Sequence, residues 1–172
     1  MDVKCVVEIK LKEVTKAFKM ISEHISLKEA LHSNTAKRLD IDNTPDEYTI
    51  ETMRITAEHV FEPVRNHFGE QICVSSFYRS PKLNKAIGGA TKSQHCKGEA
   101  IDIDDVYSKA TNADFFNYIK DHLHYDQLIW EFGDDTNPDW VHVSYCLGNN
   151  RMRVLKAIKE KGRTKYIDIT NE

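Results

Sequence analysis

The residues best suited to chemistry lie in the stretch 93–104, where an imidazole and a carboxylate stand seven positions apart, at His95 and Asp102. Gly98 lies between them and permits a sharp turn of the chain. The residues around Asp102 are mostly apolar β-formers, and their alternation predicts a strand with Asp102 on one face and isoleucines on the other. A carboxylate on such a strand is costly to bury unless it is paired or binds a metal. We therefore expect a loop and a strand to bring His95 and Asp102 to one cation.

A third candidate ligand is His142, because a catalytic zinc ion usually takes three protein ligands and leaves one position for water. Val141 and Val143 flank His142 in a run that alternates like a strand. Asp139 lies three positions before His142, close enough to act on a water at the same ion. Each of these residues alone could be an ordinary polar or capping group, so the metal interpretation depends on their clustering on one glycine turn and two strands.

Two motifs stand in order along the chain, S-x-H-x-x-G-x-A-x-D at residues 93–102 and W-x-H at residues 140–142. Together they resemble the zinc D-Ala-D-Ala carboxypeptidase family, which also includes D-Ala-D-Ala dipeptidases and the L-alanyl-D-glutamate endopeptidases of phage endolysins. The hedgehog signalling domain shares the fold of this family. Residues 75–81 and 127–131 are also similar to its members with a compact catalytic domain, so the resemblance runs from about Ser26 to Tyr145.

The resemblance implies one Zn²⁺ ion bound by His95, Asp102 and His142. It also implies an enzyme that hydrolyses stem-peptide bonds of peptidoglycan, such as D-Ala-D-Ala or L-Ala-D-Glu, through a metal-activated water. A second hypothesis comes from another class of protein. It is a zinc-binding domain of the same fold that binds a peptide or cell-wall partner without hydrolysing it.

The general base has two candidates. The family often carries a Glu three residues before its last zinc ligand, and Asp139 occupies that position here. Asp is one methylene shorter than Glu, which brings its reach to the water into question and gives the non-hydrolytic hypothesis its main support. Glu131, at the end of the preceding apolar run, is the alternative base.

Three further residues are expected to contact the substrate. Arg79 corresponds to the family's arginine, which binds a substrate carboxylate or the developing oxyanion, and its planar charged fork suits that task. Ser93 opens the central motif, and Trp140 is expected to form a wall of the cleft.

Composition is that of an ordinary globular protein, with 172 residues, 40% of them hydrophobic and 30% charged. The net charge of −3 gives no electrostatic argument for a nucleic-acid partner. No apolar run approaches the roughly 20 residues that span a bilayer. The N-terminus lacks the core of a signal peptide. We therefore expect synthesis in the cytoplasm, with release to the cell wall as a phage or prophage lysin as one route. The sequence leaves the oligomeric state open.

The fold class predicted is α+β, an antiparallel sheet with helices packed on one face, hedgehog/D-Ala-D-Ala peptidase-like, and with the site on the open face. We expect a single catalytic domain over 1–172, with an arm and short helices over 1–40, a core over 45–146 and a hairpin over 151–172. A long helix should begin after a Thr44 cap, bend at Pro63 and end at Gly69. The other expected elements are a weak strand over 1–12, helices over 14–25, 26–31, 33–39, 81–87 and 112–123, and strands over 72–78, 100–104, 127–132 and 139–146.

Overall fold

The fold is known from a computed structural model that describes residues 19–171. The weak strand expected over 1–12 and the first part of the helix expected over 14–25 lie outside the described residues. A six-stranded sheet in the order β1-β2-β4-β3-β5-β6 is the centre of the fold. Its strands are β1 (Cys73–Ser76), β2 (Ala100–Asp104), β3 (Gln127–Glu131), β4 (Trp140–Ser144), β5 (Arg153–Glu160) and β6 (Arg163–Asp168).

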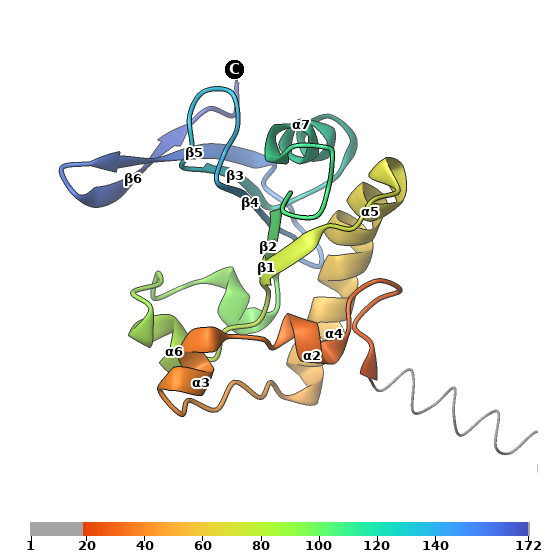
Figure 1. Ribbon diagram of the computed structural model, residues 1–172, viewed down its shortest axis with the longest axis vertical. Helices are drawn as coiled ribbons and strands as arrows, with labels where there is room; N and C mark the ends of the chain where they lie inside the picture. Colours follow the sequence, from red (N-terminus) through yellow and green to blue (C-terminus); the bar gives the residue numbers. More distant parts are fainter. Residues whose placement is uncertain (1–18, 172) are drawn as a thin grey trace, which may run out of the picture.

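Helices lie before β1, between β1 and β2, and between β2 and β3 in the chain (Figure 1). They are α2 (Leu27–Ala30), α3 (Asn34–Arg38), α4 (Glu47–Thr56), the π-helical turn η1 (Ala57–Phe61), α5 (Glu62–Phe68), α6 (Pro81–Ala86), the 3-10 turn η2 (Gln94–Lys97) and α7 (Asn112–His122). The predicted α+β class is confirmed. No helix in residues 19–171 has the length and apolar character needed to cross a membrane.

The two faces of the sheet have different roles. On one face, alternate strand residues such as Ile103, Leu128 and Val141 join a buried core with Phe61 before α5 and Phe115 of α7. This face is apolar because burial of its side chains supplies most of the driving force for folding. The opposite face carries polar residues from the same strands and is left open by the helices, as the alternation of the sequence predicted.

The long helix predicted up to Gly69 is present as three consecutive segments, α4, η1 and α5. Gly69 ends it in the left-handed conformation, with φ of 65°. The interruption predicted at Pro63 takes the form of the π-helical turn η1, which ends two residues before it, because proline has no N–H to donate to a carbonyl one turn earlier. The predicted cap was wrong. Asp46, and not Thr44, caps α4 by accepting a hydrogen bond from the Thr49 N–H at 2.8 Å.

Within the described residues, the helix expected to continue to Ile25 ends at Lys19. Met20 and Ser26 instead form an isolated antiparallel bridge, and the Ile21 N–H donates to the Ile25 carbonyl at 2.8 Å. This tight turn buries both isoleucines in the main core, with exposed fractions of 3% and 0%. Burial of two β-branched side chains therefore outweighs the helical spacing of the segment.

One pairing departs from the antiparallel pattern. β5 runs parallel to β3, with Leu155 opposite Ile129 and Ala157 opposite Glu131. β6 then turns back at Lys161-Gly162 and pairs with β5 antiparallel, which places Tyr166 opposite Ala157. The β5–β6 hairpin therefore extends the sheet on the side of β3 that faces away from β4.

Candidate metal centre

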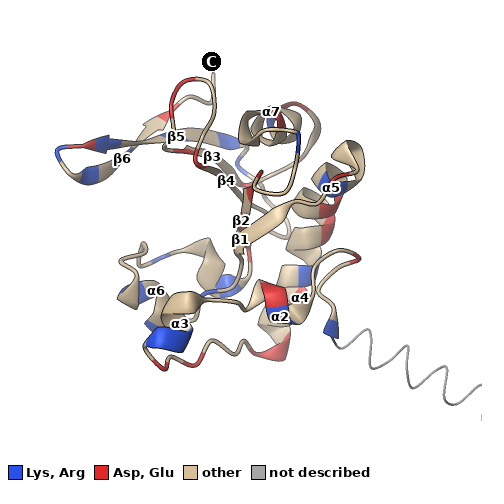
Figure 2. Ribbon diagram, viewed as in Figure 1, with Lys and Arg blue, Asp and Glu red and all other residues tan. Residues whose placement is uncertain are grey.

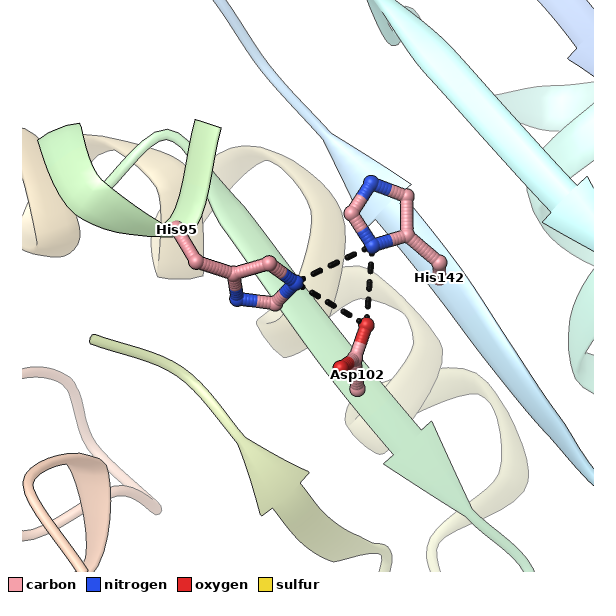
Figure 3. A group of neighbouring side chains, drawn as sticks. All are labelled: His95, Asp102 and His142. Atoms are coloured by element: carbon pink, nitrogen blue, oxygen red, sulfur yellow. Dashed lines mark hydrogen bonds and ion pairs between the residues drawn. The ribbon is translucent and has the colours of Figure 1, made fainter. Parts of the chain in front are cut away.

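Three side chains from three different elements point toward one another on the open face of the sheet (Figure 3). His95 comes from η2, Asp102 from the middle of β2 and His142 from the middle of β4. Asp102 and His142 are direct partners across the β2–β4 ladder, so their side chains must lie on the same face. All three are buried, with exposed fractions of 2%, 5% and 9% in that order.

The donor atoms form a small triangle. His95 Nε2 lies 3.1 Å from His142 Nδ1 and 3.2 Å from Asp102 Oδ1, and His142 Nδ1 lies 2.8 Å from Asp102 Oδ1. Ligands at the usual zinc bond length of about 2.1 Å stand roughly 3.4 Å apart in a tetrahedron. The triangle therefore has close to the size that a tetrahedral divalent cation requires, and the group could hold a metal ion.

The protonation of His95 also fits a ligand. Its Nδ1 lies 2.7 Å from the Phe77 carbonyl oxygen, which can only accept, so the proton is on Nδ1 and the Nε2 lone pair is free. Burial lowers the pKa of His95, although the Asp102 carboxylate opposes this effect, and the imidazole is therefore neutral. A neutral imidazole with a free Nε2 is the form that binds metals.

Asp102 is held as a carboxylate. Burial alone would raise its pKa, but the neighbouring His95 and His142 side chains bring the pKa of Asp102 well below its usual range. Its second oxygen, Oδ2, accepts a hydrogen bond from the Arg79 guanidinium. Arg79 is itself fixed by a 2.8 Å bond from its Nε to Ser76 Oγ. Arg79 thus orients one of the candidate ligands in addition to lining the cleft.

Gly98 lets the turn before β2 lie directly on the long helix. Its φ is 74°, and a Cβ added there would lie 2.6 Å from Met53 Cγ and 2.9 Å from the Thr49 carbonyl oxygen. The buried hydroxyl of Thr56 donates to the Gly98 carbonyl at 2.9 Å. This close contact fixes where η2 ends, and with it the position of His95.

Glu131 is the second buried carboxylate on this face. It ends β3, beside Trp140 of β4, and is only 7% exposed. Burial raises the pKa of Glu131 to about 7, with nearby His142 opposing the rise and Asp102 adding to it. A carboxyl group with a pKa near neutrality is suited to accept and return a proton at physiological pH.

Asp139 is placed differently. It is exposed and lies outside the residues that line the cleft. Its backbone N–H donates to the Glu131 carbonyl at 2.9 Å, and its own carbonyl accepts from Asn112 at 3.1 Å. The structure therefore brings Glu131, and not Asp139, to the same cleft as the three candidate ligands.

The candidate ligands line a cleft of about 730 Å³. Arg79, Ser93 and Trp140, the residues expected to contact substrate, all line it. So do Lys159 and Tyr166 from the β5–β6 hairpin, which the sequence interpretation did not assign to the site. The alternation of residues 153–159 could have indicated a strand with one polar face, but no local pattern indicates which strand it pairs with.

The sequence profile of the Peptidase M15 family matches residues 23–144. This is well over half of the chain, and the protein belongs to the Peptidase M15 family. The match includes all three candidate ligands together with Arg79 and Glu131, and it ends before β5. A search of curated proteins finds no match to the chain. The resemblance inferred from the two motifs is confirmed by this family assignment.

Proposed function

We propose that the protein is a zinc peptidase that hydrolyses a stem-peptide bond of peptidoglycan. The observation that carries the proposal is the triangle of His95, Asp102 and His142 in a cleft that also contains Glu131, in a chain of the Peptidase M15 family. Two imidazoles and one carboxylate form a donor set typical of catalytic zinc sites. When bound, zinc polarises the scissile carbonyl and makes water a better nucleophile at neutral pH.

Glu131 is the proposed general base. It takes a proton from the water that attacks the peptide carbonyl, and it returns that proton to the amine as the C–N bond breaks. A raised pKa supports both steps, because the carboxylate must accept the proton and then release it. Asp139 remains the second candidate from the sequence, and its exposed position gives it less support.

Arg79 is proposed to bind a substrate carboxylate or the developing oxyanion. Its guanidinium is pre-positioned by Ser76 and Asp102, so little side-chain entropy is lost when the substrate binds. Ser93 and Trp140 are proposed to contact the substrate from two sides of the same cleft. The Trp140 ring packs 5.4 Å from the Phe132 ring, which gives this side of the cleft an aromatic surface.

The test is a comparison of the zinc-loaded protein and the same protein after treatment with a chelator. We expect the zinc-loaded protein to reduce the turbidity of purified cell walls and to release new amino or carboxyl termini, identified by mass spectrometry of the muropeptides. The chelated protein should do neither until zinc is added back. Zinc binding without any release of termini would favour the alternative, a zinc-binding domain of this fold that binds a peptide or wall partner.

A further inference from the structure

The β5–β6 hairpin lies outside the part of the chain that the family profile matches, yet it forms part of the cleft. Arg153, Leu155 and Lys159 of β5 line the cleft, as do Thr164 and Tyr166 of β6. In Figure 1 the hairpin and α6 extend on the same side of the molecule, and residues 87–90 and 92–95, which follow α6 in the chain, also line the cleft.

Strand register explains why these side chains belong to the site. The ladder runs from Trp140 through Glu131 and Ala157 to Tyr166, so the four residues form one row on the open face. Ala157 is the small, fully buried member of this row, and the residues on either side of it, Glu131 and Tyr166, both line the cleft. Burial, together with the charges of Glu131 and Asp102, raises the pKa of Tyr166, consistent with a hydroxyl close to the centre.

The hairpin is strongly basic, although the chain as a whole has a net charge of −3. Between 153 and 168 it contains two acidic residues, Glu160 and Asp168, and six basic ones, and Figure 2 shows blue segments along both of its strands. The six are Arg153, Lys156, Lys159, Lys161, Arg163 and Lys165. Three of them pair with carboxylates: Arg153 with Asp168, Lys156 with Asp135 and Lys165 with Glu160.

Lys159 differs from those three because it lines the cleft and, within residues 19–171, makes no ion pair with a carboxylate. Its ammonium group donates to Thr164 Oγ1 at 3.0 Å and lies 4.5 Å from the centre of the Phe132 ring. These contacts hold the ammonium group over the cleft side of the sheet without neutralising it. A held but unneutralised cation in a substrate cleft is a site for an anionic group.

We propose that the β5–β6 hairpin is a substrate-binding wall, and that Lys159 binds a carboxylate of an acidic peptide that lies across Tyr166 toward the metal centre. This inference rests on the proposed function. β5 is two inter-strand spacings from β4, about 10 Å, and Lys159 lies four residues, about 13 Å, along β5 from Leu155, the residue in register with His142. The two displacements combine to roughly 16 Å, and an extended peptide rises about 3.3 Å per residue. Because the lysine side chain covers part of this distance, the carboxylate that it binds belongs to a residue about three to five positions from the scissile bond.

The test uses the zinc-loaded full chain and a synthetic stem pentapeptide, L-Ala-D-Glu-L-Lys-D-Ala-D-Ala. Three amidated forms are compared with it: one blocked at the D-Glu carboxyl, one at the C-terminal carboxyl, and one at both. We expect Lys159→Met to raise the KM for the free peptide roughly 5- to 10-fold, with kcat within about twofold. Lys159→Arg should restore the KM. Amidation of the carboxyl that Lys159 binds should remove the difference between wild type and Lys159→Met, which identifies that carboxyl.

Lys165→Met is the matched control, since it removes the same charge from the same hairpin on the opposite face, where Lys165 lies across from Ile158. Equal effects of Lys159→Met and Lys165→Met would overturn the proposal in favour of a general attraction between the basic hairpin and polyanions. An unchanged KM in Lys159→Met, or an equal loss on the doubly amidated peptide, would also overturn it.

Binding measured by calorimetry to zinc-loaded Glu131→Gln separates this inference from the proposed function. One outcome is that wild type releases no product, while the pentapeptide binds Glu131→Gln and the added Lys159→Met substitution weakens that binding. The peptidase proposal then fails, and the proposal that the hairpin binds substrate is supported. If wild type hydrolyses the peptide with no dependence on Lys159, the wall proposal alone fails. Thermal unfolding of each variant confirms that a loss of binding is not a loss of folding.

Discussion

The Thr56 hydroxyl on the long helix donates a 2.9 Å hydrogen bond to the carbonyl of Gly98, in the turn that follows His95. This contact joins the buried side of the fold to the candidate metal centre. It requires the helix and the turn to lie so close that only a glycine fits between them.

Replacement of that glycine should therefore damage both stability and metal binding. Gly98→Ala adds a Cβ that would meet Met53 and the Thr49 carbonyl in a left-handed conformation. We expect a loss of about 2–4 kcal/mol in the free energy of unfolding, together with weaker zinc binding. Gly69→Ala is the control: its φ is also positive, but nothing lies within 4 Å of the added Cβ, so about 1–2 kcal/mol should be lost with no effect on zinc. Urea unfolding and zinc titration measure both quantities, and equal losses in the two variants would contradict the close-contact explanation.

Asp102→Asn should remove most of the metal affinity while keeping the shape of the side chain. The substitution removes a charged candidate ligand and the ionic partner of Arg79, and we expect zinc affinity to fall on the order of 100-fold or more. Zinc at 100 times its Kd should stabilise wild type by about 2.7 kcal/mol, a gain that the variant loses at the same zinc concentration. Asp104→Asn, two residues along the same strand, is the control and should bind zinc like wild type. Unaltered zinc-dependent stabilisation of Asp102→Asn would remove Asp102 from the ligand set.

The two candidate bases can be separated by matched amide variants. Glu131→Gln should retain zinc and lose about 10²- to 10⁴-fold in kcat, because the amide cannot accept the proton of the attacking water. Asp139→Asn should retain both zinc and activity, since the exposed side chain lies outside the cleft. The measurement is steady-state hydrolysis of a stem peptide alongside the zinc content of each protein. A large loss in Asp139→Asn with full activity in Glu131→Gln would reverse the assignment.

Burial of Glu131 should also make the metal-free protein less stable as the pH rises. The folded pKa of about 7 exceeds the ordinary value of 4.5, so the folded state binds this proton more tightly than the unfolded state does. The stabilising effect of protonation is complete below about pH 4.5 and is lost as the pH rises to about 7. Relative to Glu131→Gln, wild type should therefore lose up to about 3 kcal/mol between pH 4.5 and pH 8. Urea unfolding with chelator present measures this, and a difference that stays constant with pH would mean that Glu131 has an ordinary pKa.

Local patterns in the sequence were enough to predict the strands that carry Asp102 and His142. The alternation around Asp102 and His142 predicted β2 and β4 to within two residues, because each strand has one apolar face packed on the core. The left-handed end of the long helix followed from Gly69. These features depend on neighbours within a few residues, which a single sequence contains.

The features that were missed depend on residues far apart in the chain. Nothing near Glu131 indicates that β5 pairs parallel to β3, and so the position of Tyr166 in the cleft could not be predicted. The choice between Asp139 and Glu131 also depended on burial, which results from the assembled sheet. The early turn at Ile21 and Ile25 was misjudged for the same reason, since tertiary packing of the two isoleucines decides its conformation.

The parallel pairing of β3 and β5 has a mechanical consequence. Five consecutive residue pairs, from Gln127–Arg153 to Glu131–Ala157, join the strand that carries the proposed base to the strand that carries Lys159. A peptide that docks on the hairpin therefore meets a surface whose alignment with Glu131 is already set by backbone hydrogen bonds. Because this alignment is set before the peptide binds, the free energy of docking is available to hold the scissile bond in place.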